Sequence, residues 1–242
     1  MKQATIKTFG AMDYAGNEAV NAICSNLSFA GRDLKKIVMT SCNAGEGKSF
    51  VTMQIARNLA KRGRRVVVVD ADLRRSFLIK RYGMETDEPW KGLAHYLAGY
   101  NGLEDVLYAT NLPGLFFIPA GRDISNPLPL LDTPYFSELL DRLTEMFDVV
   151  LVDAPPVGLV IDAAEIGRDC DGAVFVVEYN KTRRRELAEA RDQMLQSGCP
   201  ILGCVINKMT FDSLSAKKYY NKSYYSHYNE AYFRKPARKE RG

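Results

Sequence analysis

The chain has 242 residues and a formal net charge of +4, and 46% of its residues are hydrophobic and 26% charged. This composition predicts a globular core and excludes a wholly disordered chain. Its apolar runs, as at 66–69 and 173–177, are too short for a membrane span, and the first twenty residues lack the apolar segment of a secretory signal. Five cysteines without a C-x-x-C pair and only two histidines argue against a disulfide framework and a zinc site, so we expect a cytoplasmic protein without a membrane span of its own.

Helical segments and short apolar strands alternate along the first 207 residues. A helix is expected over 17–30, where apolar side chains recur at Val20, Ile23 and Leu27 before Gly31. Strands are expected over 36–41, 65–70, 115–119, 148–153, 173–178 and 201–207, and helices from Ser49 to near Gly63 and over 135–146, 162–170 and 183–196. The alternation implies right-handed crossovers and predicts a doubly wound α/β fold with a mostly parallel sheet flanked by helices.

A glycine-rich stretch lies between the first long strand and the helix that follows it. The run Ala44-Gly45-Glu46-Gly47-Lys48-Ser49 matches the end of the P-loop pattern G-x-x-x-x-G-K-[ST], with Cys42 where the first glycine would stand. Glycines let backbone N–H groups turn toward an anion, and the helix N-terminus adds partial positive charge. A glycine-rich turn before a helix is the alternative; the flanking strand and helix favour a P-loop NTPase that binds ATP and Mg²⁺.

Three aspartates follow runs of buried strand residues. Asp70 and Asp72 end the run of four valines at 66–69, and Asp153 ends Val149-Val150-Leu151-Val152 in a Walker B pattern. Because parallel strands end at the same sheet edge, we expect these carboxylates beside the P-loop, where they can hold magnesium or accept a proton. Ordinary strand-end or capping aspartates are the alternative.

Charge and tyrosine are concentrated near the C-terminus. Residues 217–242 contain eight Lys or Arg against two Glu, a net charge of +6, so residues 1–216 carry −2. Six of the thirteen tyrosines lie in this segment without aliphatic neighbours: Tyr219, Tyr220, Tyr224, Tyr225, Tyr228 and Tyr232. We therefore predict a globular domain over 1–216 and a flexible basic tail over 217–242.

These motifs together resemble those of the bacterial protein-tyrosine kinases. The P-loop, the run Asp70-Ala71-Asp72-Leu73-Arg74-Arg75 and the run Asp153-Ala154-Pro155-Pro156-Val157-Gly158 are similar to the Walker A, A′ and B motifs of that family, and the tyrosine-rich tail is similar to its phosphoacceptor cluster. By motif position, the resemblance implies that Lys48 and Ser49 hold phosphates and Mg²⁺, that Asp70 and Asp153 hold the metal, and that Asp72 takes the proton of the acceptor tyrosine. Nucleotide contacts are expected at residues 44–50, including Phe50, and at Asn207, whose amide can read the adenine edge or belong to strand-end turn chemistry.

The resemblance also implies partners. In that family, a cytoplasmic kinase autophosphorylates its tyrosine cluster between subunits and works with a membrane partner that controls capsule or exopolysaccharide polymerisation. A chain of this length without its own membrane span is similar to the form that needs a separate membrane-anchored activator and is recruited to the inner face of the membrane. The helix 17–30 is then an expected oligomerisation element.

This sequence departs from the family pattern at several positions. The E-x-x-R-x-x-R motif of ring assembly is reduced to Glu18, Asn21 and Cys24, so a ring-shaped oligomer is not implied. Ser76 stands where proline is common, and Phe50 where a small hydroxyl residue is common.

Three alternatives remain open from the sequence. One is a partition or positioning ATPase of the ParA/MinD type, although Asn43 occupies the position of the signature lysine of those proteins. Another is an adaptor that binds nucleotide only to organise a membrane complex. For the tail alone, the alternatives to phosphorylation are stacking on single-stranded nucleic acid and a tail that simply stays solvated; we expect no nucleic-acid partner. Arg74 and Arg75 are an arginine finger, a solvated face or a docking patch.

Overall fold

The computed structural model describes residues 1–31 and 33–209. The chain divides into two units, Met1–Asn207 and Lys208–Gly242, and the fold described below is that of the first. All six predicted phosphoacceptor tyrosines, and the predicted boundary between residues 216 and 217, lie outside the described residues.

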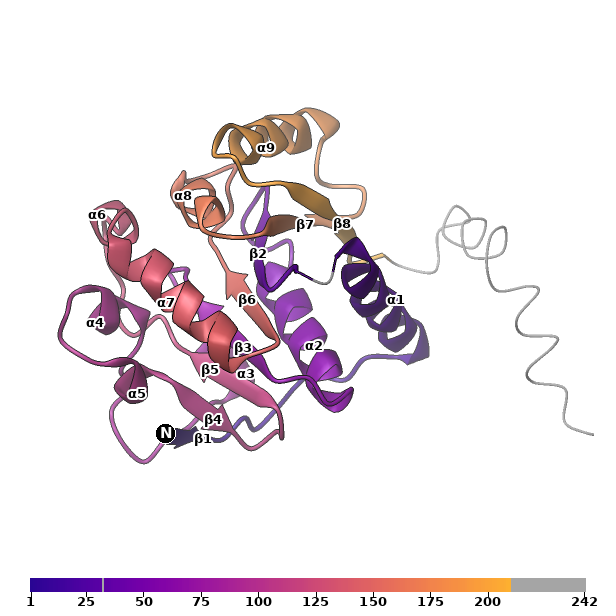
Figure 1. Cartoon of the computed structure of the whole chain (residues 1–242). Helices are drawn as coiled ribbons and strands as arrows, with labels where there is room; N and C mark the ends of the chain where they lie inside the picture. The colour runs from indigo at the N-terminus through magenta and orange to yellow at the C-terminus, as the bar shows by residue number, and fades with distance from the viewer. Residues whose placement is uncertain (32, 210–242) are drawn as a thin grey trace, which may run out of the picture. The chain divides into compact units, whose positions relative to one another are not determined.

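The first unit is built on an eight-stranded sheet (Figure 1). The strand order is β1-β4-β5-β3-β6-β2-β7-β8. Strand β4 is antiparallel to β5, β1 is parallel to β4, and the other neighbouring pairs are parallel, which confirms the predicted mostly parallel sheet. The strands are β1 (Lys2–Ala4), β2 (Lys36–Ser41), β3 (Val66–Asp70), β4 (Tyr108–Thr110), β5 (Leu115–Ile118), β6 (Val149–Asp153), β7 (Gly172–Glu178) and β8 (Ile201–Asn207).

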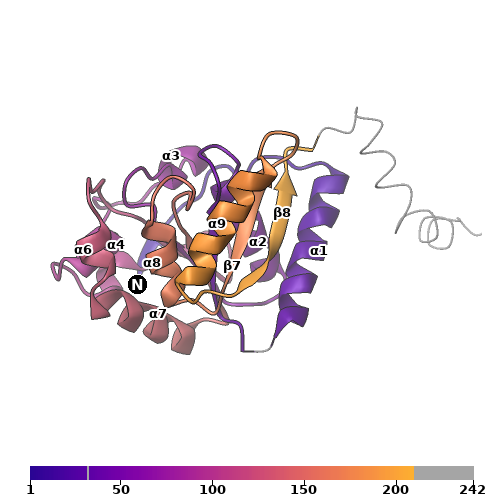
Figure 2. The same ribbon diagram turned by 90° about the horizontal axis from the view of Figure 1, so that it is seen from above.

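Helices cover both faces of this sheet (Figure 2). One face packs against α1 (Tyr14–Ala30), α2 (Lys48–Lys61) and α3 (Leu78–Tyr82). The other packs against α4 (Leu93–Leu97), α5 (Leu103–Val106), α6 (Leu128–Leu131), α7 (Pro134–Met146), α8 (Asp162–Arg168) and α9 (Arg184–Gln196). Of the described helices, none is both long and apolar enough to cross a membrane.

The four valines of β3 show why the sequence reads as a continuous apolar run. Val66 and Val68 pack into the cluster beneath α1–α3, whereas Val67 and Val69 pack into the cluster on the opposite face. All four are fully buried. Because side chains alternate between the faces of a strand, a strand covered by helices on both faces needs apolar residues at every position.

Helix α1 packs its altered motif positions against α2. Asp13 caps the helix, and its carboxylate accepts a hydrogen bond from Gly16 N at 2.8 Å. Cys24 is fully buried. The side-chain oxygen Oδ1 of Asn21 accepts a hydrogen bond from the side-chain amide of Asn58 at 2.8 Å. Cys24 therefore contacts this chain's own interior, and the half-buried Asn21 contacts α2 of the same chain.

The order of the central strands brings the predicted motifs together. Strands β3, β6 and β2 are neighbours, and Asp70 pairs with Asp153 in the register of β3 and β6. The P-loop follows β2, so it lies at the same carboxyl edge as both aspartates. Ligands of doubly wound sheets bind at this edge.

Candidate active site

The P-loop is held in a conformation that requires glycine. Gly45 and Gly47 have φ angles of 82° and 94°, in the left-handed region that favours glycine. A Cβ atom on Gly47 would also lie 2.2 Å from Nδ2 of Asn207, which donates a hydrogen bond to the Glu46 carbonyl at 2.9 Å. Asn207 therefore fastens the end of β8 to the P-loop; its role in reading adenine stays a prediction.

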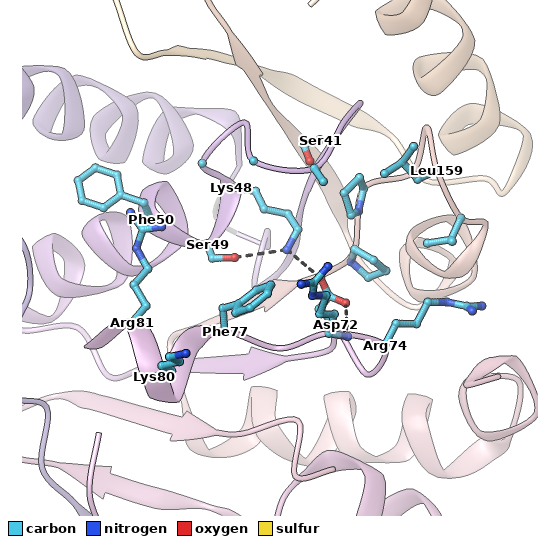
Figure 3. Close-up of a pocket in the computed structure, with 17 residues that line it drawn as sticks. Ser41, Lys48, Ser49, Phe50, Asp72, Arg74, Phe77, Lys80, Arg81 and Leu159 are labelled. Atoms are coloured by element: carbon cyan, nitrogen blue, oxygen red, sulfur yellow. Dashed lines mark hydrogen bonds and ion pairs between the residues drawn. The ribbon is translucent and has the colours of Figure 1, made fainter. Parts of the chain in front are cut away.

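Lys48 is the electrostatic centre of the site (Figure 3). Its buried ammonium Nζ lies 3.3 Å from Asp72, 3.6 Å from Asp153 and 3.3 Å from the Ser49 hydroxyl. Burial by itself lowers the pKa of Lys48, but the carboxylates of Asp153, Asp72 and Asp70 outweigh it and raise the pKa above its ordinary value. The side chain is thus a fixed cation.

Asp70 is a carboxylate without a full set of partners. It is 1% exposed, and burial together with the neighbouring Asp153 raises its pKa to about 8. The Ser76 hydroxyl donates a hydrogen bond to Oδ2, while the buried Oδ1 has no hydrogen-bond partner among the described residues. An unsatisfied buried oxygen is costly, so this atom is suited to a ligand that carries positive charge or donates protons.

Asp153 and Asp72 differ in their access to solvent. Asp153 is buried beneath Lys48, accepts a hydrogen bond from the Thr52 hydroxyl at 3.3 Å, and has a pKa raised chiefly by burial. Asp72 lines the pocket, and its Oδ1 accepts a hydrogen bond from the backbone N–H of Arg75 at 3.2 Å. Asp72 is therefore placed to meet a second substrate, whereas Asp153 is placed to meet a bound cation.

The residues present fit a magnesium ion that also binds nucleotide phosphates. Within the described ranges, no group of three or more His, Cys, Asp or Glu side chains forms a complete metal site. Mg²⁺ in nucleotide sites takes only one or two carboxylates and completes its shell with phosphate and water. Asp70, Asp153 and the Ser49 hydroxyl match that incomplete donor set.

A second network fixes the P-loop from the opposite direction. Glu46 is 3% exposed, and its carboxylate accepts hydrogen bonds from Asn43 N at 2.9 Å and from the Thr182 hydroxyl. The Asn43 side-chain amide donates to Glu186 of α9 at 3.0 Å, which lowers the pKa of Glu186. Thr182 and Glu186 were not identified from the sequence, because nothing in their local pattern distinguishes a brace from an ordinary helix start.

The P-loop opens onto a pocket of about 790 Å³. Of the predicted site residues, Ala44, Gly45, Gly47, Lys48, Ser49, Phe50 and Asp72 line it, whereas Glu46 braces the loop, and Asp70 and Asp153 are buried near Lys48. The pocket also contains residues that the sequence reasoning did not assign to a site: Ser41, Phe77, Lys80, Arg81, Pro155, Pro156, Leu159 and Val160. Ser41 ends β2, and Pro155 and Pro156 belong to the Asp153 motif without a role predicted for them; the others lie on loops and on the short helix α3, where no motif marks them.

Arg74 and Arg75 have separate roles. Arg74 forms a two-pronged ion pair with the buried Asp162, with distances of 2.6 and 2.9 Å, and donates to the Ser125 carbonyl at 3.0 Å. It therefore joins loops of this chain and is not free to act as an arginine finger. The Arg75 guanidinium lies 5.1 Å from the centre of the Phe77 ring.

Comparison with protein families and curated sequences finds similar proteins. Residues 34–167 match the AAA domain family AAA_31. The chain is 37% identical over 193 residues to the tyrosine-protein kinase CpsD of Streptococcus agalactiae serotype Ia, an alignment that covers 80% of this chain and 82% of that protein. It is 35% identical over 202 residues to CpsD of Streptococcus pneumoniae serotype 4, covering 84% and 87% of the two chains.

Solved structures show the same relationship. The kinase domain of the Escherichia coli tyrosine kinase ETK matches with a TM-score of 0.78 and 29% identity, covering 85% of this chain and 82% of that one. The septum site-determining protein MinD of Pyrococcus horikoshii, complexed with Mg-ADP, is more distant, with a TM-score of 0.61 and 26% identity over 72% of this chain and 70% of that one. The chain therefore belongs to the family of bacterial tyrosine-protein kinases and is a tyrosine kinase.

Proposed function

We propose that this tyrosine kinase transfers the γ-phosphoryl group of ATP to the tyrosine cluster of its own C-terminal tail, in trans between copies of the chain. The contact between Lys48 and Asp72 across the pocket, 3.3 Å, is the observation that carries this proposal. It supports a reaction in which Lys48 meets the transferred phosphate and the neighbouring Asp72 meets the acceptor hydroxyl.

Each residue of the site has a defined task in this reaction. The P-loop N–H groups and Lys48 bind the phosphates of ATP, and Asp70, Asp153 and Ser49 would hold Mg²⁺, which supplies charge neutralisation at the phosphates. Asp72 accepts the proton of the tyrosine hydroxyl as the tyrosine oxygen bonds to the γ-phosphorus. The bond from that phosphorus to the β–γ bridging oxygen breaks, and ADP leaves. Catalysis therefore depends on positioning and charge.

The tail is the proposed acceptor because its sequence concentrates six tyrosines in one short basic segment. Its six tyrosines fall within residues 217–242, with a net charge of +6. Each phosphorylation adds about −1.5 to −2 charge at neutral pH, so three or four transfers cancel the positive charge of the tail. Reaction in trans requires self-association, which need not be a ring because Asn21 and Cys24 replace the arginines of the ring motif.

Regulation of capsule or exopolysaccharide synthesis completes the proposal. The relatives include tyrosine-protein kinases named CpsD and putative tyrosine-protein kinases named EpsB. We propose a cytoplasmic location at the inner face of the membrane, where a membrane-anchored activator or polysaccharide co-polymerase recruits the chain.

A positioning ATPase of the MinD type is disfavoured by one contact. The Asn43 side chain stands at the signature-lysine position and is bound to Glu186 of its own α9. Because asparagine is uncharged, Asn43 supplies no cation to a nucleotide bound by a second subunit. An adaptor without catalysis is disfavoured by the Lys48–Asp72 pair, which nucleotide binding alone does not require.

The test is phosphotyrosine formation on the purified full chain. Incubation with Mg-ATP and a fragment of a membrane activator should give phosphotyrosine within residues 217–242, measured by mass spectrometry. Lys48→Met should abolish it because the phosphate cation is lost, and Asp72→Asn should reduce it by about 10²–10⁴-fold because proton transfer loses its acceptor.

Arg142→Gln is a matched control, since Arg142 is exposed on α7 and does not line the pocket. It should phosphorylate the tail at the wild-type rate. Tail phosphorylation that survives both Lys48→Met and Asp72→Asn would show that the reacting groups lie elsewhere. ATP-dependent dimerisation without phosphotyrosine would favour the positioning ATPase instead.

A further inference from the structure

Three cationic side chains line the pocket without an ion-pair partner among the described residues. Arg75, Lys80 and Arg81 are exposed, and all three border the pocket. Arg74, on the same loop, differs because the buried Asp162 neutralises it. We call Arg75, Lys80 and Arg81 the cationic ledge, and its charge is available to an anion that enters the pocket.

The cationic ledge lies beside the carboxylate assigned to the acceptor. The backbone N–H of Arg75 donates to Asp72 at 3.2 Å, so the ledge begins directly at that side chain. Figure 3 shows Lys80 and Arg81 beside Phe77 on the same side of the pocket. A peptide whose tyrosine reaches Asp72 therefore enters a pocket that these cations also line.

Two aromatic rings hold the guanidinium groups of the ledge. Arg75 lies 5.1 Å from the Phe77 ring centre, and Arg81 lies 5.5 Å from the Phe50 ring centre. Cation–π contacts of this kind orient the guanidinium plane while its N–H groups stay open to carboxylates. Phe77 is 54% exposed, so its ring also offers an apolar surface to a tyrosine side chain.

Nucleotide phosphates have their own binding groups on another part of the pocket. Backbone N–H groups of residues 44–49 and the ammonium of Lys48 surround the start of α2, where phosphate binds in P-loop proteins. The ledge belongs instead to the segment from Arg75 to Arg81 that follows Asp72. Arg81 also contacts Phe50, an expected nucleotide contact, whereas Arg75 adjoins Asp72, so affinity for nucleotide and for the acceptor must both be measured.

The tail sequence offers very different neighbours to such a ledge. In an extended chain, residues two apart point to the same side, so the side chains at positions −2 and +2 accompany the acceptor tyrosine into the pocket. Tyr228 has Glu230 at +2 and, alone among the six tail tyrosines, has an acidic and no basic residue at these positions. Tyr220 has lysine on both sides, Lys218 and Lys222.

We propose that the cationic ledge selects acceptor tyrosines that carry a carboxylate two residues away, so that Tyr228 is phosphorylated first and Tyr220 last. This inference rests on the proposed function only in taking the tail as substrate. The recognised chemistry is a phenol ring with an acidic side chain at the +2 or −2 position, on a peptide that lies across Phe77 and the ledge.

Peptide binding to the full chain tests the ledge without requiring phosphoryl transfer. Fluorescence anisotropy with Mg²⁺ and a non-hydrolysable ATP analogue compares a peptide of residues 224–234 with its Glu230→Lys form. The first should bind more tightly by up to about fivefold, the upper end of the range for one exposed ion pair. The ratio should shrink as salt rises from about 0.05 to 0.5 M, which requires no variant of the protein.

Protein variants then locate the effect. Arg75→Gln/Lys80→Gln/Arg81→Gln should remove the preference for Glu230, whereas the control Arg142→Gln should keep it. In the full chain, mass spectrometry over time should find phosphate on Tyr228 first, and Glu230→Lys should remove that lead.

Several results overturn the ledge. These are equal affinity for the two peptides, a preference that persists in the triple variant, or a triple variant that instead loses affinity for the ATP analogue, which would assign the ledge to the nucleotide. Peptide preference without any tail phosphotyrosine would refute the proposed function and leave the ledge standing. Tail phosphorylation with equal peptide affinities would refute the ledge alone.

Discussion

At the scale of single residues, the burial of the Asp70 carboxyl group lowers the stability of the folded chain as the pH rises. Its carboxyl group is buried next to Asp153, and its pKa is raised to about 8 from an ordinary value near 4. The unfolded chain releases this proton near pH 4 and the folded chain near pH 8, so the folded state binds the extra proton between these values. The contribution of Asp70 to the free energy of unfolding is consequently fully present below pH 4 and is lost as the pH rises toward 8.

Asp70→Asn should therefore stabilise the nucleotide-free chain at pH 8, with a Tm a few degrees above that of the wild type, and the gain should shrink toward pH 4. Thermal unfolding followed by circular dichroism at several pH values measures this difference. The same variant should gain less from Mg²⁺ with an ATP analogue than the wild type does, because it lacks one of the proposed metal ligands. A Tm difference independent of pH would contradict the raised pKa.

The site residues in the P-loop and at the strand ends could be predicted from the sequence, because phosphate and magnesium chemistry strongly restricts the residue types at these positions. Lys48, Asp72 and Asp153 are brought together as the sequence predicts. The Asn207 contact with the Glu46 carbonyl was not predicted, because it depends on where β8 ends relative to the P-loop. An amide at a strand end does not reveal its partner.

At the scale of elements, the Arg74–Asp162 pair clamps the loop after β3 to the start of α8. Asp162 is 1% exposed, and the Arg74 side chain is 31% exposed. The Ile124 N–H also donates to the Leu73 carbonyl at 2.7 Å, so the segment near residue 124 joins the same clamp. These contacts hold the loop that carries Asp72.

Arg74→Ala should lower the free energy of unfolding by about 3 kcal/mol, because it leaves the Asp162 carboxylate buried without its cation. The double variant Arg74→Ala/Asp162→Asn should lose less than Arg74→Ala, since no charge then stays buried. Urea unfolding measures these differences.

Arg168→Ala is the comparison, because the Arg168 contacts with Glu165 and Asp132 are on the surface. Its effect should be small. A double variant less stable than Arg74→Ala would show that Asp162 stabilises α8 by itself.

Long elements with strong periodicity were predictable, and short ones were not. The helix expected over 17–30 is α1, and the expected strand at 201–207 is β8. Strands β1 and β4 have three residues each, and helices α3 to α6 have four or five, too few for a period to show. Tertiary packing, as of Leu93 and Leu97 on the sheet, decides their form.

At the scale of the whole molecule, phosphorylation should reverse the sign of the net charge. The unmodified chain carries +4, and six phosphotyrosines add about −9 to −12, which leaves a net charge of about −5 to −8. Chain incubated with Mg-ATP and activator should elute much earlier from a cation exchanger at neutral pH.

A chain with all six tail tyrosines changed to phenylalanine should keep its original elution after the same treatment. Elution that shifts equally in this variant would place the phosphate outside the tail. Because electrostatic attraction to an acidic surface scales with charge, such a reversal favours release from an acidic partner.

The ion pairs of Lys48 have a consequence for the enzyme between turnovers. The carboxylates of Asp72 and Asp153 lie close together at one sheet edge, and the Lys48 ammonium, 3.3 Å and 3.6 Å from them, offsets the repulsion between them. When ATP binds, its phosphates compete with these carboxylates for the Lys48 ammonium. Part of the attraction between lysine and phosphate therefore offsets the loss of the ion pairs. Lys48 thus stabilises the acidic cluster, and the affinity for nucleotide is lower than it would be if these ion pairs did not have to be weakened.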